Sequence, residues 1–196
     1  MPVLFVRSSF LDVPHGFSLR EGGVSVGPLS SLNLGHAVGD TEANVEENVK
    51  RLGAAAGLRP GRLATLRQVH GSRVVRADAK VRAEADALFT DDVTGTWVGV
   101  TSADCVPVLL STEDGRLVAA VHSGWRGTEV RVAARAVEAL LQQGAHAKAL
   151  RAAVGPCIQA CCYEVSSELA ARFFSHRREG GVTGRHLAFV APAPLS

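Results

Sequence analysis

Three side chains of the types that bind transition metals stand at or just after short β-rich segments. They are His70 in Gln68-Val69-His70-Gly71, Cys105 in Ala103-Asp104-Cys105-Val106-Pro107, and His122 in Val121-His122-Ser123-Gly124-Trp125-Arg126-Gly127. Two imidazoles and one thiolate suit zinc, and copper is also compatible with them. Three protein ligands leave a fourth position for water, as in catalytic zinc sites. The three positions are too far apart in sequence for a zinc-finger knuckle, so a shared site has to be assembled by tertiary structure.

These residue types also allow other interpretations. Each of the three is alternatively a buried side chain whose polar atoms are satisfied by backbone groups, which composition alone favours. A copper oxidase is a second alternative, because His, His and Cys also form blue-copper centres. Met1 is the only methionine and the seven histidines form no His-x-His pair, which counts against a laccase. A non-enzymatic metal-binding module is a third. The glycine and polar residues around each position favour the shared site.

Four further residues are candidates for binding a substrate or phosphate: Arg126, Ser25, His36 and Gln68. Arg126 precedes a predicted helix, where a guanidinium and free backbone N–H groups can hold phosphate, although a surface ion pair is equally typical. Ser25 ends a Gly-Gly-Val-Ser segment that is either a phosphate-cradling turn or an ordinary turn. His36 lies in the same glycine-rich region, and Gln68 lies in the segment of His70.

Short β-rich segments alternate with turns in the middle of the chain, and predicted helices stand on both sides. Strands are predicted at 63–69, 73–76, 97–101, 107–110, 117–121 and 151–154. Helical spacing predicts one helix over 40–56, with Asp40 as N-cap and Gly57 as the stop. A second helix over 128–143 would bury Val130, Ala134, Val137 and Leu141, and a third begins near 166. This order predicts an α+β fold.

Length and composition indicate one domain over residues 1–196, since a chain with 46% hydrophobic residues can bury a substantial core. With 21 Lys plus Arg against 19 Asp plus Glu and no run of like charge, we expect no nucleic-acid partner. We find no signal peptide or membrane-spanning segment, and therefore expect a cytoplasmic protein that binds small molecules. The four cysteines have no disulfide-framework spacing, and Cys157, Cys161 and Cys162 are interpreted as packing residues.

Six motifs, in this order, resemble the YfiH-like family. They are Arg20-x-Gly22-Gly23-Val24-Ser25, Ser31-Leu32-Asn33-Leu34-Gly35, Gln68-Val69-His70-Gly71, Ala103-Asp104-Cys105, His122-Ser123-Gly124-Trp125-Arg126-Gly127-Thr128 and Val154-Gly155-Pro156-Cys157-Ile158. The family is also called the polyphenol oxidase or laccase-domain family, and its members are regarded as purine nucleoside phosphorylases. The resemblance covers about residues 15–190.

The resemblance implies zinc, with copper possible, on His70, Cys105 and His122. It also implies phosphorolysis of adenosine and inosine to free base and ribose 1-phosphate, phosphorolysis of methylthioadenosine, and adenosine deamination. Within that chemistry we expect Asp104 to move protons and Arg126 to orient phosphate. The implied fold layers mixed sheets between helices (α/β/β/α), similar to the catalytic domain of cytotoxic necrotising factor. That likeness also makes a metal-free hydrolase with Cys105 as nucleophile and His122 as base a reasonable alternative.

The chain departs from the family pattern in one place. After Tyr163-Glu164-Val165 the family usually has a further segment with an Asn-rich helix and another cysteine, whereas here residues 173–180 and Thr183-Gly184-Arg185 follow almost at once. The resemblance therefore says less about the second sheet, about substrate affinity, and about whether the protein is a monomer or a homodimer. The three metal positions are unaffected.

Overall fold

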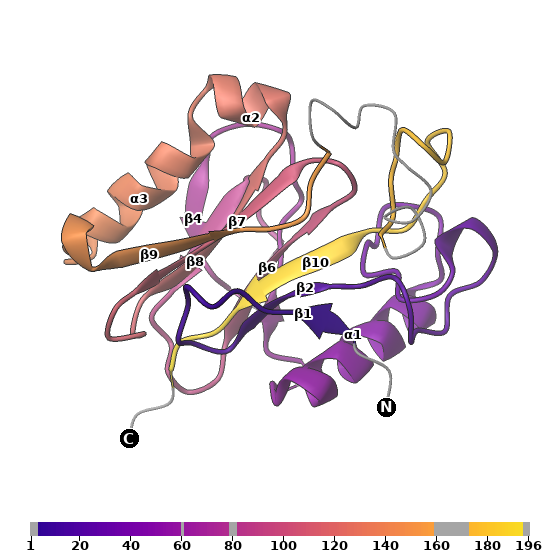
Figure 1. Ribbon diagram of the computed structural model, residues 1–196, viewed down its shortest axis with the longest axis horizontal. Coiled ribbons are helices and arrows are strands. Elements are labelled where there is room, and N and C mark those ends of the chain that lie inside the picture. The colour runs from indigo at the N-terminus through magenta and orange to yellow at the C-terminus, as the bar shows by residue number, and fades with distance from the viewer. Residues whose placement is uncertain (1–3, 60, 79–81, 159–172, 194–196) are drawn as a thin grey trace.

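Two five-stranded mixed sheets form the centre of the computed structural model, which describes residues 4–59, 61–78, 82–158 and 173–193 (Figure 1). The first sheet has the order β1 (Phe5–Val6), β2 (His15–Ser18), β10 (His186–Val190), β6 (Trp97–Ser102), β3 (Leu63–Ala64). The second has the order β4 (Val74–Arg76), β5 (Ala87–Thr90), β8 (Val118–Ser123), β7 (Val106–Thr112), β9 (Leu150–Val154). Only the β3–β6 and β4–β5 pairs of these sheets are parallel.

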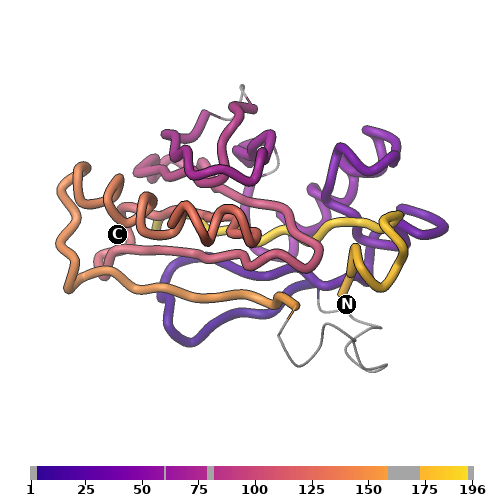
Figure 2. The backbone as a smooth tube through the Cα atoms, turned by 90° about the horizontal axis from the view of Figure 1, so that it is seen from above, coloured from indigo at the N-terminus to yellow at the C-terminus, as the bar shows by residue number. Residues whose placement is uncertain are grey.

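Alternation of side chains along the strands produces four layers. In β10, Ala188 and Val190 pack into the core between the two sheets, while Leu187 and Phe189 join Leu52 of α1 (Glu42–Ala56) on the outer face. The outer face of the second sheet is covered by α3 (Val132–Gln142). Figure 2 shows α3 in front of these strands, at the opposite end of the molecule from α1. The predicted α/β/β/α layering is confirmed.

The first helix matches its prediction except at its N-terminus. Gly57 ends α1 in the left-handed conformation, with φ 70°, as predicted. The N-cap, however, is Thr41 rather than Asp40, because the Thr41 hydroxyl accepts a hydrogen bond from Asn44 N–H at 3.2 Å. Asp40 was the wrong choice because its carboxylate accepts instead from Thr41 N–H and from the Asn44 side chain. Aspartate and threonine are both favoured at the N-cap, so the sequence alone does not distinguish Asp40 from Thr41.

The helix predicted over 128–143 is two helices, α2 (Trp125–Glu129) and α3. Arg131 separates them, because its φ of 61° lies in the left-handed region that interrupts a right-handed helix. The break also moves the buried face: α3 buries Val132, Ala136 and Leu140, whereas Val130 and Leu141 are exposed. The predicted buried face was therefore wrong by about one position.

The strand predictions succeed for most of the second sheet and fail for most of the first. The predicted strands 73–76, 97–101, 107–110, 117–121 and 151–154 correspond to β4, β6, β7, β8 and β9. The strand predicted over 63–69 stops at Ala64, and β1, β2, β5 and β10 were not predicted. The helix expected from about 166 begins outside the described residues. Among the described helices, none combines the length and apolar composition that crossing a bilayer requires.

Candidate metal centre

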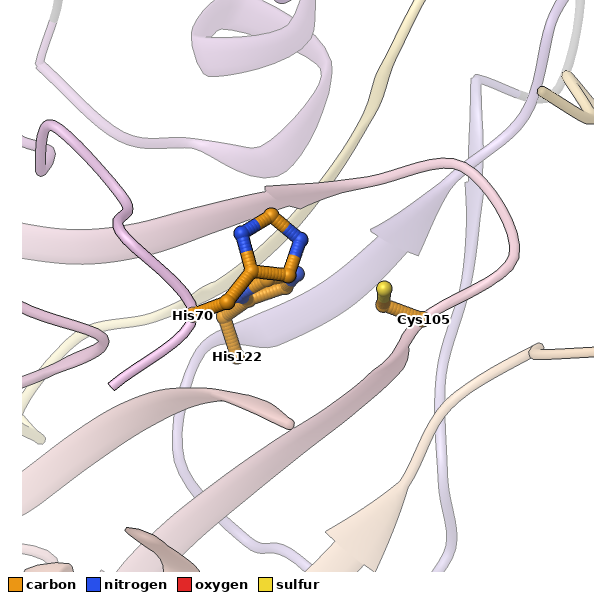
Figure 3. Close-up of side chains that lie close together, drawn as sticks. All are labelled: His70, Cys105 and His122. Atoms are coloured by element: carbon orange, nitrogen blue, oxygen red, sulfur yellow. The ribbon is translucent and has the colours of Figure 1, made fainter. Parts of the chain in front are cut away.

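Two strand ends and one turn bring the three predicted ligands together. His122 pairs with Pro107 near the end of β8, so Cys105, two residues before Pro107, lies beside that end. His70 lies in the turn between β3 and β4. The ligand atoms of the three side chains lie within 4.8 Å of one another, and Figure 3 shows the Cys105 sulfur directed towards the imidazoles. The two rings meet edge to face, with centroids 4.8 Å apart.

The cluster is closed on one side and open on the other. His122 is buried, Cys105 is half-buried and His70 is exposed. Gly124 forms part of the closed side, because a Cβ atom there would lie 2.9 Å from His70 Cδ2 and 3.1 Å from Cys105 Sγ. Any larger residue at this position would push two of the three ligands away. The exposed edge of His70 therefore marks the side from which a substrate can approach.

Asp86, which the sequence analysis missed, organises the centre from behind. Its buried carboxylate accepts hydrogen bonds from the backbone N–H groups of Val69, His70 and Gly71 at 3.2, 2.9 and 2.7 Å. It also accepts the Nδ1 hydrogen bond of His122 at 2.9 Å. The Asp86 side chain therefore holds both the turn that carries His70 and the imidazole ring of His122. A carboxylate placed directly before the buried strand Ala87–Thr90 is the only local signal of this role.

The hydrogen bond to Asp86 determines which nitrogen of His122 is available. With Nδ1 donating to the carboxylate, Nε2 is left for a metal, the arrangement found around zinc-bound histidines. Burial alone lowers the pKa of His122, but the hydrogen bonds to Asp86 and Cys105, together with their negative charges, raise it to about 9. The same charges that hold a proton here attract a metal cation, which binds in competition with that proton.

Electrostatics act in the opposite direction on His70. Although one edge of the His70 ring is exposed, the desolvation of the rest of it lowers its pKa most strongly, and the charges of His122, Arg126 and Arg185 lower it further, against an opposing effect of Asp86. A histidine with a lowered pKa keeps a free nitrogen lone pair near neutral pH, which is the form that binds a metal.

The backbone is strained on both sides of the centre. His70 has a φ of 59° and Asp104 a φ of 85°, in the left-handed region that residues other than glycine seldom adopt. The carboxylate of Asp86 holds the first turn, and Ile158 N–H donates to Asp104 O at 3.0 Å in the second. Strain of this kind persists where surrounding contacts enforce it, and it concentrates at functional sites.

The donor set fits a zinc ion. A tetrahedral zinc with its usual bond lengths places nitrogen and sulfur ligands about 3.4–3.6 Å apart. The three ligand atoms here are no more than 4.8 Å apart, and the exposed His70 ring can rotate to shorten the separation. Two imidazoles, one thiolate and one open side are therefore compatible with a zinc ion once the ligand atoms move closer together.

Two further predicted residues lie beside the centre. The Arg126 guanidinium stacks over the exposed Trp125 ring at 5.0 Å from its centroid. Arg126 lies inside α2 rather than before a helix, because the helix begins at Trp125. Asp104 precedes Cys105, and its two oxygens accept hydrogen bonds from the Ser175 hydroxyl at 2.7 Å and from Arg177 N–H at 2.9 Å. These bonds anchor the Cys105 loop, and the role of Asp104 in proton transfer stays a prediction.

The other predicted substrate residues have different surroundings. The Gln68 amide pairs with the Thr101 backbone, donating to its carbonyl at 2.7 Å and accepting from its N–H at 2.8 Å. Ser25 donates to Asp40 at 2.6 Å. His36 is largely exposed, and partial desolvation of its ring together with the positive charge of Arg82 lowers its pKa. Their proposed contacts with substrate stay predictions.

The remaining thiols do not join the cluster where the structure describes them. Cys157 is half-buried and lies outside the group of three ligands. The next residue, Ile158, donates a backbone hydrogen bond to Asp104, so Cys157 lies near the centre without being part of it. Cys161 and Cys162 fall outside the described residues.

Comparison with known proteins shows the family of the chain. Residues 14–173 match the family model described as multi-copper polyphenol oxidoreductase laccase. The chain belongs to this laccase family. A purine nucleoside phosphorylase of Deinococcus radiodurans is 42% identical over 173 residues, covering 88% of this chain and 67% of that protein. The Shigella flexneri purine nucleoside phosphorylase YfiH is 40% identical over 160 residues, covering 81% and 64%. The chain spans about two thirds of the length of these curated relatives.

Two solved structures share the fold. YlmD from Geobacillus stearothermophilus superposes with a TM-score of 0.86 at 26% identity, covering 98% of this chain and 100% of that one. YfiH from Bacillus licheniformis superposes with a TM-score of 0.83 at 24% identity, covering 91% and 92%, which supports the fold alone. The resemblance to the YfiH-like family is confirmed, while the likeness to cytotoxic necrotising factor stays a prediction.

Proposed function

We propose that this protein is a zinc-dependent purine nucleoside enzyme that splits adenosine and inosine with phosphate. The observation that carries the proposal is the convergence of His70, Cys105 and His122 on one point with an open side. The names of the curated relatives, purine nucleoside phosphorylases from Deinococcus radiodurans and Shigella flexneri, supply the substrate class. Methylthioadenosine phosphorolysis and adenosine deamination complete the proposed activities.

Phosphorolysis requires one bond to form as another breaks. A phosphate oxygen attacks the ribose C1′ atom, the bond from C1′ to the purine nitrogen breaks, and the purine leaves with that electron pair and takes up a proton. The products are free base and ribose 1-phosphate. When bound, zinc supplies Lewis-acid stabilisation of developing negative charge. The reaction also requires that the attacking phosphate oxygen, C1′ and the purine nitrogen be held in line, and side chains that bind phosphate and nucleoside would hold them so.

The residues around the centre have properties suited to these tasks. His70, Cys105 and His122 would hold the ion, with Asp86 fixing the His122 ring. The guanidinium of Arg126 would orient phosphate, as planar donors do. Two apolar side chains adjacent in sequence to residues of the centre, Val69 beside His70 and Trp125 beside Gly124, are exposed at 47% and 71%. An exposed indole offers a purine a stacking surface.

Deamination would use the same site with water in place of phosphate. Water adds to C6 of adenosine, ammonia leaves, and inosine forms, so no phosphate is consumed. Asp104 is the nearest carboxylate in sequence to a ligand and is our candidate for moving protons in this reaction.

The test is a phosphate-dependence assay. Purified protein with bound zinc is incubated with adenosine or inosine, with and without inorganic phosphate, and free base and ribose 1-phosphate are quantified. We expect both products with phosphate and neither without it. Equal base release in both reactions would refute phosphorolysis, and no consumption of either nucleoside would refute the whole assignment.

A copper oxidase is the second candidate, because the family description names multi-copper oxidoreductases. Metal analysis separates the possibilities. Stoichiometric zinc supports the nucleoside enzyme, copper with visible absorption supports an oxidase, and activity without metal supports a hydrolase in which Cys105 is the nucleophile and His122 the base.

A further inference from the structure

Arg185 stands immediately before β10, beside the loop that carries Cys105. His186 pairs with Ser102 in the antiparallel ladder of β10 and β6, so the residue before His186 faces the residue after Ser102. The chain that leaves β6 at this point leads directly to Asp104 and Cys105. The strand register therefore places Arg185 next to the metal centre.

The base of the Arg185 side chain is fixed by the glycine-rich loop. A Cβ atom on Gly35 would lie 2.6 Å from Arg185 Cγ, so only glycine leaves room for the arginine. The backbone N–H of Arg185 donates to Asn33 Oδ1 at 2.9 Å, and its carbonyl accepts from Leu34 N–H at 3.0 Å. The position from which the guanidinium extends is thus defined by packing and by hydrogen bonds.

Among the residues that the structure describes, hydrogen bonds from the Arg185 guanidinium leave from one edge only. Nη1 donates to the carbonyl oxygens of Thr183 and Gly184, each at 3.1 Å. Within residues 4–59, 61–78, 82–158 and 173–193, neither Nε nor Nη2 has an acceptor and no carboxylate forms an ion pair with Arg185. The edge formed by Nε and Nη2, which carries two parallel N–H groups, is therefore not occupied by any described residue.

The electrostatic surroundings of Arg185 include the centre itself. Burial lowers the pKa of Arg185, and the charges of Asp104 and Cys105 oppose that effect. Arg185 and Arg126 in turn both lower the pKa of His70. Asp104 does not neutralise Arg185 by direct pairing, because its oxygens accept from Ser175 and Arg177. A half-buried cation without a bonded counter-ion favours the binding of an anion.

We propose that Arg185 binds inorganic phosphate at the metal centre through its Nε and Nη2 edge. Two parallel N–H groups match two phosphate oxygens, a geometry that a lysine ammonium cannot reproduce. Arg126 on α2 contributes a second guanidinium, so phosphate is held between the end of β6 and the start of α2. The inference rests on the proposed function, in which phosphate is the attacking substrate.

The test measures phosphate binding without any nucleoside. Inorganic phosphate is titrated by calorimetry into the zinc-loaded full chain of the wild type and of Arg185→Lys. The substitution keeps the charge and removes the two-point contact, so we expect phosphate affinity to fall at least about tenfold. Arg62→Lys is the control, because Arg62 donates to Asp92 and Thr94 instead. It should bind phosphate as the wild type does.

Gly35→Ala provides an independent variant, since the added methyl group displaces the Arg185 side chain while leaving its charge. It should also weaken phosphate binding if folded, as judged by thermal unfolding. The inference is overturned if the wild type binds no phosphate, or if Arg185→Lys binds it with unchanged affinity, even when the substitution lowers the unfolding temperature. Phosphate binding by the wild type without base release would refute the proposed function and leave the assignment of Arg185 intact.

Discussion

Two regions of the molecule are rich in glycine and short polar residues, but they use their side chains in opposite ways. In the loop of residues 22–40, the polar groups bond to one another: Ser25 donates to Asp40, while Asn48 of α1 donates to Ser25 and to Asn33 O at 2.8 Å. At the metal centre, the ligand atoms of His70, Cys105 and His122 converge instead on a common point.

The two regions differ in which residues supply the hydrogen-bond partners. At the centre, Asp86 takes up the backbone N–H groups and the Nδ1 hydrogen of His122, so the three clustered side chains do not have to satisfy those groups themselves. In the loop, the candidate functional group is itself part of the hydrogen-bond network, because the Ser25 hydroxyl donates to Asp40 and accepts from Asn48. A polar residue is therefore a stronger candidate for chemistry when another side chain makes the hydrogen bonds that the surrounding structure needs.

Cys105→Ala should have the largest effect of any single substitution in either region. Removing one of three protein ligands leaves two, too few for stable catalytic zinc, so we expect loss of both zinc and activity. His70→Ala and His122→Ala should give the same result. Zinc content by mass spectrometry, nucleoside turnover and thermal unfolding provide the measurements.

Cys157→Ala is the matched control, because its thiol lies near the centre but outside the cluster. It should keep zinc and activity and lose at most some stability through a small cavity. A Cys105→Ala protein that is inactive yet retains full zinc would make Cys105 a nucleophile or base instead of a ligand. A Cys105→Ala protein that stays active would show that the centre takes no part in catalysis.

The sequence predicted the three side chains that the structure brings together, but not the residue that supports them. His70, Cys105 and His122 were identifiable because their residue types are distinctive and glycine follows two of them closely. Asp86 was not, since the hydrogen-bond partners of its carboxylate lie at least 15 residues away and an aspartate is seldom expected in a core. Pairing at such separations is a property of the folded sheets and leaves no local pattern.

The same limit applies to the fold. The longer strands, such as Val106–Thr112 and Val118–Ser123, contain enough β-branched and apolar residues to be recognised. His15–Ser18 and Ala87–Thr90 are only four residues long and buried throughout, so they show no alternation between polar and apolar faces. Arg131 breaks a helix through its backbone conformation, which its residue type does not reveal.

Asp86→Asn should have the next largest effect. The amide keeps the size of the side chain but presents an NH₂ group to N–H donors, which loosens both the His70 turn and the His122 ring. We expect zinc affinity to fall about 10–100-fold, measured by competition with a chelating dye.

Asp92→Asn tests whether this effect is specific to the centre. Asp92 also accepts several hydrogen bonds, but it follows the end of β5 that pairs with the start of β8, away from His122. This variant should lose stability without a change in zinc affinity. Equal losses of zinc in the two variants would show that general destabilisation, not the orientation of His122, is responsible.

Arg126→Lys and Trp125→Ala should separate phosphate from nucleoside. Losing the planar guanidinium should raise KM for phosphate about tenfold with little change in KM for nucleoside. Losing the exposed indole should do the reverse, by a similar factor, because base stacking is lost. Steady-state kinetics with each substrate varied in turn give both constants. An unchanged phosphate dependence in Arg126→Lys would exclude that residue from phosphate binding.

Ser25→Ala should have the smallest effect, confined to stability. The variant loses the hydrogen bond to Asp40 and one acceptor of Asn48, which still donates to Asn33 O, so we expect a cost of about 1 kcal/mol in the free energy of unfolding. Thermal unfolding should occur about 2–4 °C lower, while zinc content and kcat/KM stay at wild-type values.

The pH dependence of this loss identifies its origin in the loop. Burial raises the pKa of Asp40, but hydrogen bonds from Ser25, Asn33 and Asn44 outweigh it and lower the pKa. A lowered pKa stabilises the fold above the unfolded-state value, and the contribution disappears as pH falls through the folded-state value. The deficit of Ser25→Ala should therefore be largest near pH 7 and shrink in acid. An unchanged unfolding temperature with a raised KM for phosphate would instead place Ser25 in the phosphate site, and the two glycine-rich regions would then share one function.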